Sequence, residues 1–227
     1  MSVKKFSIDE AIRFGWETTK NNLGFFVGLM IVMGLIHIIP TIIVEAVKEK
    51  SAFLGIIFSI ANCVLVIVVS LGLVRISLDF CDGKKMTFEE ALANLFGQYR
   101  LFFKALFASI VYNLAVGIGL IFLIIPGIIF GIKLGFFEYF IVDKKAEAMK
   151  SLRMSSELTK GVRWNLFIFW ILLAIINLVG AACLLIGLLV TIPTTMIAMA
   201  YVYRKLLAQI EAERNAQPAF ETPRAGE

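Results

Sequence analysis

The stretch from residue 117 to residue 164 constrains the fold more than any other part of the chain. It begins GIGLIFLIIPGIIFGIKLGFFEYFIVDKK and continues AEAMKSLRMSSELTKGVRW. An apolar segment turns at Pro126 and Gly127, returns with a single Lys133 inside it, and leads into a charged amphipathic helix. Because apolar runs of about 20 residues can cross a bilayer, this pattern predicts a polytopic membrane protein.

The composition excludes an ordinary soluble domain. The chain is 59% hydrophobic and 17% charged, whereas soluble domains average roughly 45–50% apolar and 25% charged residues. The net charge of +5 comes from basic residues scattered beside the apolar runs, without the basic face and interleaved aromatic residues of a nucleic-acid binder. We therefore expect no nucleic-acid partner.

Six apolar segments have the character of membrane spans, although the fourth and sixth are short. This predicts an all-α fold of six transmembrane helices arranged as three hairpins, each preceded by a cytoplasmic amphipathic helix. The expected spans are residues 23–47, 52–78, 102–125, 127–142, 165–186 and 188–203.

The basic residues predict the orientation of these spans. Only Lys48 and Lys50 lie between the first two spans, and the turns at 126–127 and 184–189 carry no charge. Nearly all other Lys and Arg residues fall on the side shared by both termini. The positive-inside rule then places both termini in the cytoplasm of a multi-pass protein of the bacterial inner membrane.

Three related helix starts predict an internal threefold repeat. Ser7 with Glu10 and Thr87 with Glu90 have capping-box spacing, and the third helix begins near Glu147. The expected repeat units are 6–80, 84–143 and 144–207, within a helical domain 1–211 that a disordered tail, 212–227, follows. The amphipathic helices favour struts beneath the hairpins over surfaces for headgroups or a partner.

Lys133 is the sharpest candidate for a binding residue. A charge at that depth costs at least about 2.5 kcal/mol, so it is either functional or snorkels toward headgroups. Gly127, Gly131 and Gly135 form a small-residue ridge for helix packing, and Glu138 falls on the same face of that helix.

Other polar and aromatic residues within the spans complete the candidate set. Lys133 would need a partner, and the candidates are mid-span amides, which more often serve as packing contacts. Those amides are Asn62, Asn113 and Asn177. Trp16 and Trp164 stand where interface anchors occur, and Arg75 with Asp79 predicts a local ion pair. Neither a catalytic motif nor a metal-ligand cluster is evident, so we expect no catalytic residue, metal or cofactor.

The segment from residue 119 to 164 resembles a bacterial membrane-protein superfamily. The shared features are the Pro-Gly hairpin, the amphipathic helix EAMKSLRMSSELTKG and the tryptophan before the next span. The superfamily includes the membrane region attached to some glycerophosphodiester phosphodiesterases and many uncharacterised inner-membrane proteins. This resemblance implies a bundle of hydrophobic hairpins in the cytoplasmic membrane and no particular substrate.

Three functions remain open. The first is a non-enzymatic membrane protein that binds an anionic lipid, a membrane-protein partner or a second copy, with Lys133 at the contact. The second is a small-molecule or lipid transporter or channel, in which Lys133 and the three asparagines line a path. The third is an intramembrane enzyme, for which Glu138, Tyr112 or Tyr139 would supply the base.

Overall fold

The computed structural model describes residues 5–183 and 186–216. All regular structure within these ranges is helical, which confirms the predicted all-α class. The elements in chain order are α1 (Ile8–Asn21), α2 (Leu23–Lys48), α3 (Ala52–Cys81), α4 (Phe88–Gly97), the 3-10 helix η1 (Tyr99–Leu101), α5 (Phe102–Phe122), α6 (Ile124–Leu134), α7 (Phe137–Lys144), α8 (Ala148–Leu158), α9 (Arg163–Ala182) and α10 (Leu188–Ala216).

Five helical segments in the described ranges are long and apolar enough to cross a membrane. They are Leu23–Lys48, Ala52–Cys81, Phe88–Phe122, Ile124–Lys144 and Arg163–Ala182. Helix length and hydropathy thus confirm a multi-pass membrane protein. The helix α10, which contains the expected sixth span, is not among these segments, so the six-span arrangement stays a prediction.

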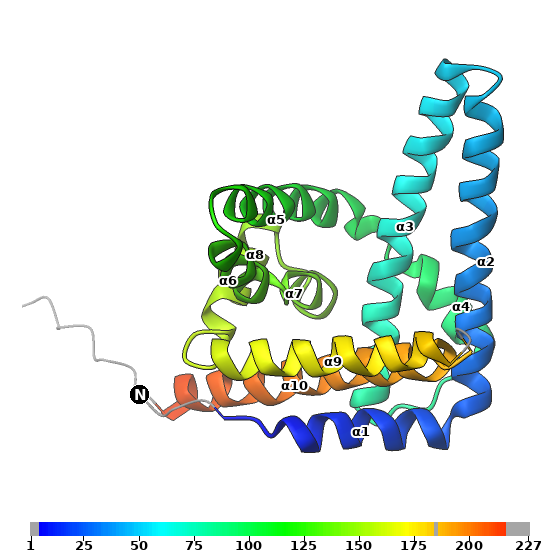
Figure 1. The fold of residues 1–227 in the computed structure, drawn as a ribbon. Helices are drawn as coiled ribbons and strands as arrows, with labels where there is room; N and C mark the ends of the chain where they lie inside the picture. The colour runs from blue at the N-terminus through cyan, green and yellow to red at the C-terminus, as the bar shows by residue number, and fades with distance from the viewer. Residues whose placement is uncertain (1–4, 184–185, 217–227) are drawn as a thin grey trace, which may run out of the picture.

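The helices do not all run in one direction. In Figure 1 the α2–α3 hairpin stands steeply across α9 and α10, while α1 lies along α10. In the same view α5 runs on the other side of the molecule, with α6, α7 and α8 between it and α9. The last helix continues to Ala216, into the region expected to be a tail, and residues 217–227 lie outside the described residues.

The packing of α1 on α10 is close because Gly15 has no side chain. A β-carbon at Gly15 would lie 2.4 Å from the backbone oxygen of Thr194. Nearby, the Glu10 carboxylate accepts a hydrogen bond from the Tyr201 hydroxyl and pairs with Lys205 at 3.3 Å. These two contacts, Tyr201 first, lower the pKa of Glu10.

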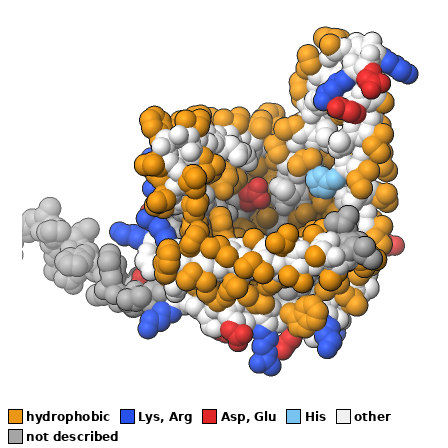
Figure 2. All heavy atoms as spheres, viewed as in Figure 1, with side chains coloured by type: hydrophobic (Ala, Val, Ile, Leu, Met, Phe, Trp, Pro, Cys, Tyr) orange, Lys and Arg blue, Asp and Glu red, His pale blue; other side chains and the backbone are white. Residues whose placement is uncertain are grey.

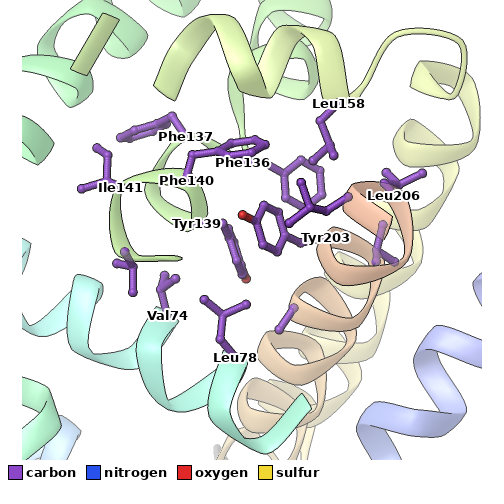
Figure 3. Packing of buried hydrophobic residues seen from close by; sticks show 14 of the residues in the cluster. Val74, Leu78, Phe136, Phe137, Tyr139, Phe140, Ile141, Leu158, Tyr203 and Leu206 are labelled. Carbon is purple, nitrogen blue, oxygen red and sulfur yellow. The ribbon is translucent and has the colours of Figure 1, made fainter. Parts of the chain in front are cut away.

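The buried core lies where α7 meets α3, α8 and α10. The ring of Tyr203 is fully buried, and its centroid lies 5.2 Å from those of Tyr139 and Phe140 (Figure 3). Leu78 of α3 and Leu158 of α8 belong to the same buried cluster. Because α7 belongs to the candidate span Ile124–Lys144, close van der Waals packing in this cluster, rather than removal from water, holds α7 in place.

The expected fourth span is broken into two helices. The helix α6 ends at Leu134 and α7 begins at Phe137, so backbone groups at the break lose their helical partners. Ser155 of α8 donates a hydrogen bond to the Lys133 carbonyl at 3.1 Å and accepts one from the Phe136 amide at 3.0 Å. Thr159 also donates to the Lys133 carbonyl, at 3.3 Å. The amphipathic helix α8 therefore packs its hydroxyl groups onto protein.

The first turns of α4 and α1 show which of the predicted capping hydrogen bonds form. At α4, the Thr87 hydroxyl accepts from the Glu90 amide at 3.3 Å, and the Glu90 carboxylate accepts from the Thr87 amide at 2.8 Å. This confirms the second predicted capping box. At α1 the Ser7 hydroxyl caps the Glu10 amide at 3.2 Å, but the Glu10 carboxylate contacts α10 instead of returning to Ser7. The repeat itself stays a prediction.

Candidate functional site

Lys133 finds its partner on its own helix. Its Nζ lies 5.7 Å from the centre of the Phe130 ring, within the range of a cation–π contact. Among the residues that the structure describes, no carboxylate lies within ion-pair distance of this ammonium group. The contact supplies a local reason for the charge at this depth, and a binding role for Lys133 stays a prediction.

The three asparagines are distributed over three helices and make separate contacts. Asn113 on α5 is exposed and donates to the Ser109 carbonyl of its own helix at 2.8 Å. Asn177 on α9 donates to the Thr195 hydroxyl on α10 at 3.4 Å. Asn62 on α3 keeps a buried side-chain oxygen without a hydrogen-bond partner. None of these contacts brings an asparagine to Lys133.

The glycine ridge divides into two close contacts and one open position. A β-carbon at Gly127 would lie 2.5 Å from the Leu120 side chain on α5, and one at Gly135 would lie 2.4 Å from the Trp170 ring on α9. At Gly131 the nearest atom would be the Tyr112 hydroxyl, at 3.8 Å. Close helix approach therefore depends on Gly127 and Gly135, with room for a methyl group at Gly131.

Glu138 is the second residue of α7, directly after the α6–α7 break, and is partly buried in the candidate span Ile124–Lys144. The helix α7, which carries Glu138, packs against α3 and α5. Figure 2 shows a hollow between the α2–α3 hairpin and α5, with an acidic side chain on its floor. Within the described ranges no basic side chain pairs with Glu138, which makes it the more isolated of the two charged candidates on this span.

An apolar groove between α6 and α9 was not expected from the sequence. Its volume is about 340 Å³, and its walls carry a single charged residue, Arg163. The lining residues are Ile125, Ile128, Ile129, Ile132, Arg163, Trp164 and Phe167. Arg163 was indistinguishable in the sequence from the other basic residues that flank spans, because the groove joins residues more than 30 positions apart.

A second apolar cavity lies next to this groove. It measures about 320 Å³ and shares Ile128, Ile132 and Phe167 with the first. Its far end lies at Val116 of α5 and Ala174 of α9. We call these two neighbouring cavities together the α6–α9 groove, in which Arg163 lines the first cavity only.

The expected interface anchors are both exposed. Trp16 on α1 is 49% exposed and Trp164 on α9 is 70% exposed. Trp164 lies at the arginine end of the α6–α9 groove, with its ring 5.4 Å from that of Phe167. An amphipathic indole in this position suits the boundary between headgroups and acyl chains.

A network of charged residues, also unexpected, joins the carboxyl-terminal ends of α3 and α7 to the middle of α10. Arg204 binds Asp82 at 2.7 Å and Asp143 at 2.9 Å, and the Tyr203 hydroxyl donates to Asp143 at 3.0 Å. Burial lowers the pKa of Arg204, but Asp143 and Asp82 raise it by more, so its pKa is raised. The predicted pair of Arg75 and Asp79 is confirmed at 2.9 Å.

Comparisons with known proteins find uncharacterised relatives. One is an uncharacterised protein of Mycobacterium bovis, and two are uncharacterised proteins from two strains of Mycobacterium tuberculosis. Each is 30% identical over 161 residues, which is 70% of this chain and 48% of the relative. The chain thus spans about half the length of the curated relatives it matches. No protein-family model and no solved structure matches the chain.

The chain is thus distantly similar to these relatives, and because they are uncharacterised, the similarity indicates no activity. The resemblance to the phosphodiesterase-associated membrane superfamily stays a prediction. In the part of the chain that the structure describes, no group of three or more His, Cys, Asp or Glu side chains could hold a metal ion. The geometry to be explained is therefore the α6–α9 groove and the isolated carboxyl group of Glu138.

Proposed function

We propose that this chain is a non-enzymatic integral membrane protein that binds a membrane lipid in the α6–α9 groove. The observation that supports this function is the groove itself, since its walls are apolar apart from Arg163. Inside the bilayer an acyl chain gains van der Waals contact with such walls, because the surrounding lipid is equally apolar and supplies no hydrophobic driving force. The first cavity places such a chain beside Arg163, and the second offers further apolar surface as far as Ala174.

The proposed location is supported by the distribution of basic residues and by the organisms of the relatives. The positive-inside distribution supports a bacterial inner-membrane protein with both termini in the cytoplasm, and the relatives are bacterial. In this arrangement α10 contains a sixth span, and an amphipathic helix on the cytoplasmic side precedes each outward hairpin. In this orientation Arg163 and Trp164, at the start of α9, reach the inner leaflet.

Filling the groove tests the function. The Ile128→Trp variant places a large ring on the wall shared by both cavities. Ile121→Trp is the matched control, because Ile121 is 84% exposed on α5 and lines neither cavity. Native mass spectrometry of the full chain in a delipidating detergent should show retained phospholipid on the wild type and on Ile121→Trp, and much less on Ile128→Trp.

The same spectra separate lipid from protein occupants. Equal lipid retention by all three proteins would end the lipid proposal. If wild-type spectra instead showed a dimer that Ile128→Trp disrupts, a second copy of the chain would cover the groove. A co-purifying protein of fixed stoichiometry would point to a membrane-protein partner.

Glu138 favours transport as a second candidate function. An intramembrane carboxyl group without a basic partner is typical of ion and proton pathways, and broken helices often line such sites. Glu138 meets both conditions, since it follows the α6–α7 break. Vesicles loaded with a pH-sensitive dye and given a potassium diffusion potential would test it. Proton flux present with wild type and absent with Glu138→Gln would favour transport, whereas no flux with either would reject it.

A further inference from the structure

Arg163 is a charged side chain that the protein leaves unsatisfied. It is partly buried, and its Nε is enclosed without a hydrogen-bond partner. In the described part of the chain no carboxylate lies within ion-pair distance of its guanidinium group. A buried donor without an acceptor is unfavourable, and more so on a charged group, so an acceptor that a ligand supplies would stabilise this position.

The backbone around Arg163 carries partial positive charge, the same sign as the guanidinium group. Arg163 is the first residue of α9, a helix of 20 residues, and the N-cap residue Val162 offers no side-chain hydrogen bond. The first amides of a helix lack intrahelical acceptors, and the helix dipole places partial positive charge there. An anion beside Arg163 would therefore meet a guanidinium group and the positive end of a helix together.

The surroundings distinguish a lipid headgroup from a free anion. Arg163 opens onto a wall of isoleucine side chains on α6, and Trp164 and Phe167 border the same cavity. Free phosphate would gain nothing from this apolar wall. A molecule with an anionic group at one end and a hydrocarbon chain at the other would satisfy both parts of the site.

We propose that Arg163 binds the phosphate of an anionic phospholipid whose acyl chain lies in the α6–α9 groove. This inference rests on the proposed function and adds to it the class of headgroup and the residue that recognises it. Arginine suits the task because its planar fork donates two parallel hydrogen bonds to phosphate oxygens. Lys133, the residue favoured by the sequence, does not line the groove and stacks on Phe130.

Headgroup selectivity is the measurement that tests Arg163. Full-length protein in detergent would be titrated with phosphatidylglycerol and, separately, with zwitterionic phosphatidylcholine of the same acyl chains, and bound lipid counted by native mass spectrometry. Wild type should prefer phosphatidylglycerol. Arg163→Gln should lose roughly tenfold in affinity for phosphatidylglycerol, as expected for loss of a charge-assisted contact, and lose less for phosphatidylcholine, because the choline cation of that lipid already offsets the charge of its phosphate.

Two further variants make the outcomes distinct. Lys160→Gln removes a neighbouring exposed charge and should keep wild-type selectivity. Arg163→Lys keeps the charge without the planar fork and should fall between wild type and Arg163→Gln, which preserves the test if Arg163→Gln does not fold. Wild-type selectivity in both Arg163 variants would overturn the inference. The proposed function would survive that result as long as Ile128→Trp weakens the binding of both lipids, and would fail if Ile128→Trp weakens neither.

Discussion

The hydroxyl group of Ser155 donates a hydrogen bond to the backbone carbonyl of Lys133, 3.1 Å away and 22 residues earlier in the chain. The same hydroxyl accepts the Phe136 amide at 3.0 Å, so one small side chain satisfies both sides of the α6–α7 break. Broken helices occur at membrane depth only where neighbouring groups replace the lost hydrogen bonds. Ser155 therefore allows α7 to leave the direction of α6.

Ser155→Ala should destabilise the protein by about 1–3 kcal/mol, because the buried Phe136 amide loses its acceptor. The measurement is the midpoint of thermal unfolding in detergent, followed by size-exclusion chromatography after heating. Ser156→Ala is the control, since Ser156 lies on the same helix and is less buried. Equal midpoints for the two variants would show that the break is held by other contacts.

The glycine ridge predicts opposite outcomes at two neighbouring positions. Gly127→Ala should cost roughly 1–3 kcal/mol by overpacking, because the new methyl group meets Leu120 at 2.5 Å. Gly131→Ala should be neutral or stabilise by up to about 1 kcal/mol, since its methyl group has space and alanine favours helix. Thermal midpoints in detergent measure both. A larger loss at Gly131 would mean that α5 and α6 approach each other differently.

The charged network predicts a large effect at Arg204. Arg204→Met leaves the nearly buried Asp143 carboxylate with only the Tyr203 hydroxyl and a distant Lys144, at 3.9 Å. After allowance for the partial exposure of Arg204, we expect a loss of about 1–3 kcal/mol.

The control for Arg204 is an exposed ion pair on α1. Arg13→Met removes the Arg13–Glu17 pair, which joins two exposed side chains at 2.8 Å. Such pairs contribute at most a few tenths of a kcal/mol. Urea unfolding in detergent should rank Arg204→Met well below Arg13→Met, and comparable losses would count against the network as a structural element.

Acid should weaken the contact between α1 and α10. The pKa of Glu10 in the folded protein lies below its ordinary value of 4.5, because Tyr201 donates to its carboxylate and Lys205 pairs with it. The resulting stabilisation is present above that value and is lost as the pH falls through the lowered pKa. Glu10→Gln should therefore show a smaller drop in thermal midpoint than wild type when the pH is taken below about 4.5. Parallel pH profiles for the two proteins would contradict this.

Features set by neighbouring residues were predictable from the sequence, and features set by distant residues were not. Thr87 and Glu90 form their capping box because both partners lie within one turn. Ser7 and Glu10 have the same spacing, yet Glu10 binds Tyr201, which lies 191 residues away. Hydropathy likewise located the membrane segments, because it sums over many residues and needs no partner.

In the candidate site, too, features set by nearby residues were predictable from the sequence and contacts with distant residues were not. The ridge at Gly127, Gly131 and Gly135 was visible as a spacing, but the contacts that separate Gly131 from the other two come from α5 and α9. Lys133 was prominent because charge inside a span is rare, whereas Arg163 was hidden among span-flanking basic residues. What distinguishes Arg163 is the wall opposite it, which α6 supplies.

The close packing of Gly15 against Thr194 has a consequence for how the protein is made and inserted. The helix α1 leaves the ribosome early, yet its main packing partner, α10, is made after every other described helix. Until then the α1 face around Gly15 lacks its α10 partner, and the intervening helices are inserted before this contact can form. The contact between α1 and α10 is therefore the last of the helix contacts to form. Resistance of α1 to protease, followed during synthesis, would show when this contact forms.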